Sequence, residues 1–171
     1  MLFAIITVLG PISGAHFNPA VTLAFLLRRA IDLKTAALYI PVQITAAILG
    51  VWAAHAMFDQ SILQTSQTMH RTGPAQWWSE IVATFGLLFV IFGGLRARPE
   101  SVPTLVAFYI TGAYWFTSST SFANPAVTIA RGFTDTFSGI FPGHILMFVV
   151  MQGLGVAIAH LLLPALLKEK C

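Results

Sequence analysis

Residues 18–24 read Asn-Pro-Ala-Val-Thr-Leu-Ala, and residues 124–130 read Asn-Pro-Ala-Val-Thr-Ile-Ala. The second copy begins 106 positions after the first, six of its seven residues are identical, and a loop that contains serine precedes each copy. A match of this length is improbable by chance. We therefore infer that one structural unit was duplicated within the chain.

The composition is that of a membrane protein. Of the 171 residues, 57% are hydrophobic and 9% are charged, and the mean hydropathy is +0.81. So few charged residues cannot cover a globule that faces water on all sides. We expect an all-α, multi-pass protein of the lipid bilayer, and we attribute its formal net charge of +3 to short connections between spans rather than to a nucleic-acid partner.

Apolar runs predict where the chain crosses the bilayer. A hydrocarbon core of roughly 30 Å needs a helix of about 20 residues. We expect spanning helices at Thr35–Phe58, Trp77–Leu95, Val102–Thr117 and Phe141–Leu163. Met1–Gly10 is apolar but only half as long, and we expect it to end at Pro11.

The two repeated motifs each open a short apolar run. Asn18 to Ala30 covers roughly 18 Å as a helix, about half the hydrocarbon core, and the second run ends near Phe133. Asn caps a helix start, and Pro fits the first helical position. Because irregular backbone at membrane depth is tolerated only when it is buried in protein or lines a cavity, paired half-spans indicate a permeation site.

The basic residues predict the orientation of the chain. Seven of the nine lie on one side if the first half-helix ends in the cytoplasm, as the positive-inside rule requires: Arg28, Arg29, Lys34, Arg96, Arg98, Lys168 and Lys170. An odd number of crossings then separates the two half-helices. They should enter from opposite faces and meet with their N-termini together.

The segment Ser13–Thr22, followed about a hundred residues later by a second Asn-Pro-Ala, resembles the major intrinsic protein family of aquaporins and aquaglyceroporins. This resemblance implies an inverted repeat of six spanning helices and two re-entrant half-helices, one pore per subunit, and a homotetramer. We expect a single channel domain at 1–171, with the rest of the first repeat at 1–58 and the second repeat at 75–171.

The resemblance also implies that the family's first helix and the outer half of its second have no counterpart before Met1. We therefore expect an N-terminally truncated form of a longer channel. A preceding in-frame helix with an Ala-Glu-Phe-type segment would favour a complete channel. The alternative is a non-conducting subunit that assembles with or modulates full-length channels.

The repeated motifs are the predicted centre of the pore. Each half-helix directs a partial positive charge at mid-membrane, which repels cations. Asn18 and Asn124 can each donate an N–H to a passing solute oxygen. Alternatively, these two side chains only cap their helices. The predicted motif residues are Asn18, Pro19, Ala20, Asn124, Pro125 and Ala126.

Two further residues are predicted to support the pore. Glu80 is the acidic residue well inside a predicted span, where a carboxyl group needs partners. The resemblance implies that Glu80 hydrogen-bonds the loop of the second motif, although an interfacial glutamate near the helix start is the alternative. His16 resembles the family's histidine beside the pore, and a packing role is its alternative. The remaining histidines share no face, so we expect neither a metal site nor a cofactor.

The resemblance places the selectivity-determining ring on Gly112, Ser121 and Val127. The family usually has arginine where this chain has Val127, so the ring should be wider and more apolar. Arg131 lies one helical turn beyond Val127. It can supply the missing charge near the outer mouth of the pore, or it can extend toward the membrane interface.

Together these features predict a passive channel for small neutral solutes such as water and glycerol-like polyols. Val127 and residues 121–126 resemble a bacterial subgroup encoded with arsenic-resistance genes, which implies passage of uncharged arsenicals such as arsenous acid. A bacterial inner membrane is the expected location. An enzyme is excluded from the prediction because the sequence shows no nucleophile–base pair and no phosphate-binding loop.

Overall fold

The computed structural model describes residues 1–168, which form helices and connecting loops without a strand. Lys170, one of the basic residues used to predict the orientation, lies outside the described residues. The elements in chain order are α1 (Leu2–Ser13), α2 (Pro19–Leu27), α3 (Leu33–Met57), α4 (Pro74–Ala97), η1 (Pro99–Ser101), α5 (Val102–Phe116), α6 (Pro125–Ala130), η2 (Arg131–Phe133) and α7 (Pro142–Leu166). The predicted all-α fold is confirmed.

Within the described residues, α3, α4 and α7 are long and apolar enough to cross a membrane, with 25, 24 and 25 residues. The helix predicted at Val102–Thr117 is shorter than a full span, because α5 has 15 residues and ends at Phe116. After Phe116 the chain turns into the loop that precedes the second motif. The shortness of α5 leaves room for that loop at the depth of the helices.

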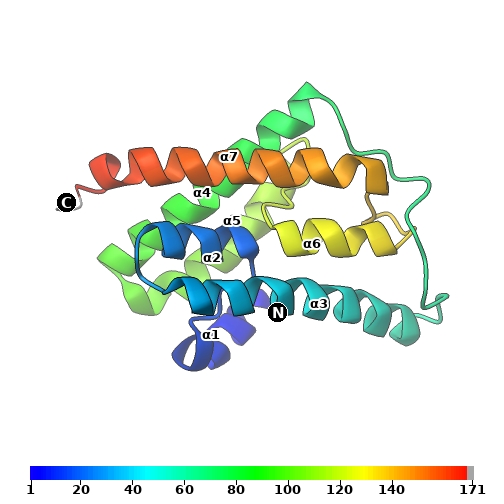
Figure 1. Cartoon of the computed structure of the whole chain (residues 1–171), viewed down its shortest axis with the longest axis horizontal. Coiled ribbons are helices and arrows are strands. Elements are labelled where there is room, and N and C mark those ends of the chain that lie inside the picture. The colour runs from blue at the N-terminus through cyan, green and yellow to red at the C-terminus, as the bar shows by residue number, and fades with distance from the viewer. Residues whose placement is uncertain (169–171) are drawn as a thin grey trace.

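The half-helices α2 and α6 lie end to end between α3 and α7 (Figure 1). Each begins at the proline of its motif, and α6 continues into η2. The prediction that the first half-helix reaches Ala30 is wrong, because α2 ends at Leu27. Arg29 adopts a left-handed conformation with φ 57°, and the N–H of Ala30 donates to the carbonyl of Phe25, which turns the chain toward α3.

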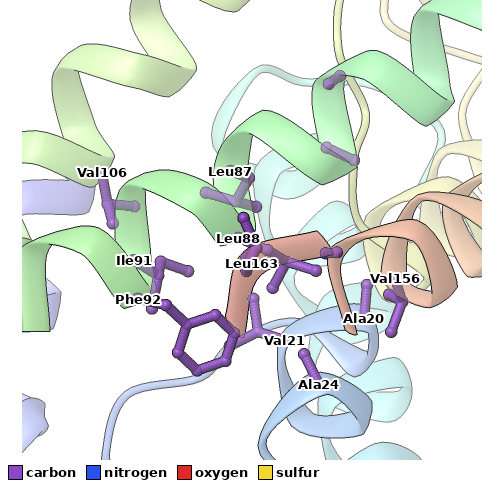
Figure 2. Close-up of a cluster of buried hydrophobic side chains, with 13 residues drawn as sticks. Ala20, Val21, Ala24, Leu87, Leu88, Ile91, Phe92, Val106, Val156 and Leu163 are labelled. Carbon is purple, nitrogen blue, oxygen red and sulfur yellow. The ribbon is translucent and has the colours of Figure 1, made fainter. Parts of the chain in front are cut away.

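The core lies between α2, α4 and α7. Figure 2 shows Val21 and Ala24 of α2 directed toward Leu88 and Phe92 of α4. The helices α4 and α7 approach each other closely at Gly155, where an added Cβ would lie 2.8 Å from the Cβ of Thr84. Small residues allow such close approach between membrane helices, where dispersion contacts replace the hydrophobic effect.

The helix α1 differs from its prediction at its end. It continues through Pro11 to Ser13 and stops at Gly14, which has φ 73°. Pro11 lacks an N–H and so removes one helical hydrogen bond, and the helix ends two residues later at Ser13. The short helix then leads directly into the loop of the first motif and packs against α5.

The two ends of the molecule differ in charge. The α2–α3 connection, the end of α4 and the end of α7 lie at the left in Figure 1, and they carry Arg28, Lys34 and Arg98 among the basic residues. The long loop 59–73 and η2 lie at the opposite end with Arg71 and Arg131. The segments whose basic residues were predicted to share one side of the membrane thus lie at one end of the described helices.

Candidate permeation site

Both motif asparagines cap their half-helices. The side-chain oxygen of Asn18 accepts a hydrogen bond from the N–H of Ala20 at 2.9 Å. That of Asn124 accepts from the N–H groups of Ala126 at 3.0 Å and Val127 at 3.3 Å. Each cap therefore satisfies orphan donors at a helix start and holds the side chain in one orientation.

The side-chain nitrogens connect the two motifs. Asn18 Nδ2 donates to the carbonyl of Ala123 at 2.7 Å, and Asn124 Nδ2 donates to the carbonyl of Phe17 at 2.9 Å. The bonds are reciprocal, so each half-helix is fixed to the loop that precedes the other. An amide nitrogen carries two N–H donors, and these bonds use one in each motif. Each asparagine can thus cap its helix and also bind a solute, because its second side-chain N–H takes part neither in the cap nor in the bond to the other loop.

The loops before the motifs share an unusual backbone. In each loop the residues four, three and one positions before the asparagine have positive φ. They are Gly14 (73°), Ala15 (48°) and Phe17 (47°) in the first loop, and Thr120 (60°), Ser121 (48°) and Ala123 (45°) in the second. Left-handed conformations are unfavourable for residues with a Cβ. The hydrogen bonds from the opposite motif stabilise these left-handed conformations here. The conformations in turn direct the carbonyls of Phe17 and Ala123 toward the asparagines.

Glu80 holds the second loop. Its two carboxyl oxygens accept the N–H of Phe122 at 2.9 Å and the N–H of Ala123 at 2.8 Å. Gln152 Nε2 of α7 donates to the same carboxyl group at 2.6 Å, and both side chains are fully buried. Three donors around one buried carboxyl group offset the cost of placing it inside the helices.

Two glutamines occupy equivalent positions in the two repeats. Gln43 Nε2 donates to Thr22 Oγ1 at 2.9 Å, and Gln152 Nε2 donates to Thr128 Oγ1 at 2.8 Å. Each glutamine is the eleventh residue of its 25-residue helix, and each threonine is the fourth residue after its motif asparagine. The sequence prediction missed these residues. The sequence did contain a signal for them: a polar amide within a long apolar helix needs hydrogen-bond partners, as does the carboxyl group of Glu80.

His16 lies beside the first motif. Its Nδ1 is 3.1 Å from Thr22 Oγ1, and its ring centroid is 4.5 Å from that of Phe25. His16 also lines the cavity described next. His16 therefore both packs against Phe25 and lines the cavity.

A cavity of about 230 Å³ is lined by residues of both motifs. Its lining begins near Leu95 and Val102 at the basic end of the molecule and reaches Arg131 at the other end. Most lining side chains are apolar. The polar ones are few: His16, Asn18, Tyr114, Ser121, Asn124 and Arg131. The Ser121 hydroxyl is buried and has no hydrogen-bond partner within residues 1–168.

Two of the three residues predicted for the selectivity ring, Ser121 and Val127, line the cavity. The third, Gly112, does not: it is exposed, and no atom lies within 4 Å of where its Cβ would be. The lining face of α5 consists of Val102, Val106, Ile110 and Tyr114. These residues recur every four positions, so Gly112 lies on another face of the helix. Tyr114 is a further polar residue that the sequence prediction missed.

Residues 1–117 match the profile of the family described as Major intrinsic protein. The chain belongs to this family. It is 52% identical over 168 residues to aquaglyceroporin AqpS of Rhizobium meliloti (strain 1021), a match that covers 98% of the chain and 72% of AqpS. It is also 33% identical over 97 residues to aquaporin-5 of Rattus norvegicus, which covers 54% of the chain and 37% of that protein.

A plant relative gives a similar match. The probable aquaporin PIP2-5 of Arabidopsis thaliana is 34% identical over 116 residues, which covers 61% of the chain and 40% of that protein. The chain thus spans less than half the length of these animal and plant relatives. Membership in the major intrinsic protein family, together with the apolar helices, identifies a multi-pass membrane protein of a channel family rather than an enzyme.

Proposed function

We propose that this major intrinsic protein is a passive channel for water and small polyols, formed by one domain at 1–171 with repeats at 1–58 and 75–171. The observation that carries the proposal is the cavity that contacts both motif asparagines and extends between the two ends of the helices. An apolar passage with few polar groups suits neutral molecules, because it offers no replacement for the hydration shell of an ion.

The donors at the centre of the cavity support the same proposal. Asn18 and Asn124 lie where the N-termini of α2 and α6 meet. Each amide can donate its second N–H to a hydroxyl or water oxygen. The positive ends of the two half-helix dipoles oppose the entry of cations.

Val127 supports a preference for larger neutral solutes. It lines the cavity directly after the second motif, and its short apolar side chain neither narrows the passage nor binds solute oxygens strongly. Glycerol and uncharged arsenous acid, which both present several hydroxyl groups, are the solutes that we propose beside water. The name of the relative AqpS, an aquaglyceroporin, agrees with this class.

Stopped-flow measurements on vesicles that contain the protein test this proposal. Water, glycerol and arsenous acid fluxes are compared between the wild type and Val127→Arg. We expect arginine to reduce the fluxes of the two larger solutes on the order of tenfold, and the water flux less, because it narrows the cavity. Val127→Leu is the matched control, with added bulk but no charge, and should reduce these fluxes less than arginine does.

Equal fluxes of all three solutes through the wild type and Val127→Arg would contradict the role of Val127. A wild type no faster than protein-free vesicles would contradict the channel itself. That second result would favour the non-conducting subunit that assembles with other channels.

We also propose a homotetramer in a bacterial inner membrane. Two faces of small residues support assembly: Ala46 and Gly50 on α3, and Gly153 and Ala157 on α7 are all exposed. No described atom lies within 4 Å of where a Cβ would be at Gly50 or Gly153, so a neighbouring helix can approach closely. Native mass spectrometry of the detergent-solubilised protein would give the number of subunits.

A further inference from the structure

Arg131 lines the cavity at the end of the molecule opposite the α2–α3 connection and the end of α4. It directly follows α6, one helical turn beyond Val127. Its Nη2 donates to the hydroxyl of Tyr114 at 2.9 Å, and its Cζ lies 4.2 Å from the ring centroid of Phe122. All three residues contribute to the cavity lining, so the guanidinium lies beside the passage.

The charge of Arg131 is not neutralised by a neighbour. No carboxyl group within residues 1–168 forms an ion pair with it, and its side chain makes no hydrogen bond there other than the one to Tyr114. A guanidinium carries five N–H donors, of which this bond uses one. The remaining donors can bind an oxygen atom of a solute that enters the cavity.

A second guanidinium strengthens the positive potential at this end. The Cζ of Arg71 lies 5.3 Å from the ring centroid of Phe122. Arg71 donates to the carbonyls of Gly139 and Phe137 and to the hydroxyl of Thr120, so it is held in place by the loops. Burial, and next the nearby charge of Arg131, lower the pKa of the Arg71 guanidinium.

We propose that Arg131 is a specificity-determining residue of this channel. Its guanidinium, oriented by Tyr114 and stacked over Phe122, excludes cations and donates hydrogen bonds to neutral solutes that carry oxygen. Val127 leaves the adjacent part of the lining uncharged, so among residues 1–168 Arg131 is the residue that brings a positive charge into the lining at this end. This inference rests on the proposed function, because it assumes that solutes pass through the cavity.

The test measures proton flux and water flux in vesicles that contain the full chain. Proton entry is followed with an enclosed pH-sensitive dye under a potassium diffusion potential, and water flux by stopped-flow light scattering. Arg131→Gln is compared with the wild type, with Arg131→Lys, and with Arg29→Gln. Arg29 is an exposed arginine that does not line the cavity, so its variant controls for the loss of one charge.

We expect Arg131→Gln to raise proton flux on the order of tenfold, because a positive charge beside the passage is removed. Water flux should stay within about twofold of the wild type, which also shows that the variant is folded. Arg131→Lys should keep proton flux low, since it keeps the charge. The double variant Val127→Arg with Arg131→Gln should restore exclusion, because it returns a guanidinium to the same cavity.

Proton flux through Arg131→Gln that equals that of Arg29→Gln would overturn the inference while leaving the channel intact. A leak through Arg131→Lys as large as that through Arg131→Gln would also overturn it, because the charge would then not decide exclusion. If the wild type conducts no water above protein-free vesicles, the proposed function fails, and the inference fails with it.

Discussion

The loops before the two motifs have the same backbone, but within residues 1–168 different side chains hold them. Positive φ occurs at the same three positions in both, and each loop accepts a hydrogen bond from the asparagine of the other. In the second loop, Glu80 accepts the N–H groups of Phe122 and Ala123. In the first loop the corresponding N–H groups belong to His16 and Phe17, and no acceptor for them lies within residues 1–168.

Within residues 1–168, the two loops thus share a backbone set by the motif but differ in the described side chains that hold them. The motif sequence sets the cap, the proline start and the loop backbone, which are therefore alike. The support comes from neighbouring helices: among the described residues, Glu80 of α4 provides a carboxyl group to the second loop. The described contacts beside the first loop are the Gln43–Thr22 bond, the His16–Thr22 contact and the bond from the Tyr39 hydroxyl to the carbonyl of Ser13.

The largest effect is expected from the carboxyl group. Glu80→Gln replaces one acceptor oxygen by an N–H₂ group, which faces the N–H groups of the loop and Gln152. Loss of one member of a buried network costs about 3 kcal/mol, so we expect a lower midpoint of thermal unfolding in detergent and little solute flux. Glu100→Gln, at an exposed position, is the matched control. Equal midpoints for the two variants would show that Glu80 does not stabilise the loop.

The two glutamines offer a more symmetric comparison. Gln152→Leu removes the bonds to Glu80 and Thr128, whereas Gln43→Leu removes only the bond to Thr22. We expect about 2 kcal/mol of destabilisation for Gln152→Leu and about 1 kcal/mol for Gln43→Leu. Chemical denaturation of the two variants measures the difference. If Gln43→Leu destabilised the protein more than Gln152→Leu, the first repeat would depend more on its glutamine than the second.

The amide protons report the same difference without a mutation. The N–H groups of Phe122 and Ala123 are buried and bonded to Glu80, so they should exchange with solvent on the order of tenfold more slowly than those of His16 and Phe17. Hydrogen–deuterium exchange with mass spectrometry of peptides from each loop gives the rates. Similar protection in both loops would indicate that the first loop also has an acceptor.

The smallest effect is expected at an exposed carboxyl group with similar bonds. Asp135 accepts the N–H groups of Gln67 and Thr68 and the hydroxyl of Thr68. These bonds, first the one from the Thr68 backbone, lower the pKa of Asp135. A lowered folded pKa stabilises the protein above the ordinary carboxyl pKa, and this contribution disappears as the pH falls through the folded value.

Asp135→Asn should therefore speed proteolysis of loop 59–73 at neutral pH, and only slightly, because the site is exposed to water. The difference from the wild type should vanish in acid below the folded pKa. A difference that persists there would show that the carboxyl charge is not the cause.

Much of the arrangement of the site could be predicted from local signals. Asparagine followed by proline marked both helix starts, and α2 and α6 begin at Pro19 and Pro125. The polar Glu80 inside an apolar run indicated a residue with partners, which it has. The end of α2 could not be predicted as well, because apolar residues continue to its end and a turn of the backbone at Arg29, rather than a change in composition, ends the helix.

The sequence by itself determined the membrane class, the duplication and the meeting of the half-helices, because these follow from apolar length, residue identity and charge placement. Only the tertiary structure decided which face of α5 lines the cavity. That helix is apolar around its circumference, so its pattern gives no direction, and its rotation is set by packing against α1 and α4. This rotation places Tyr114 rather than Gly112 beside Arg131.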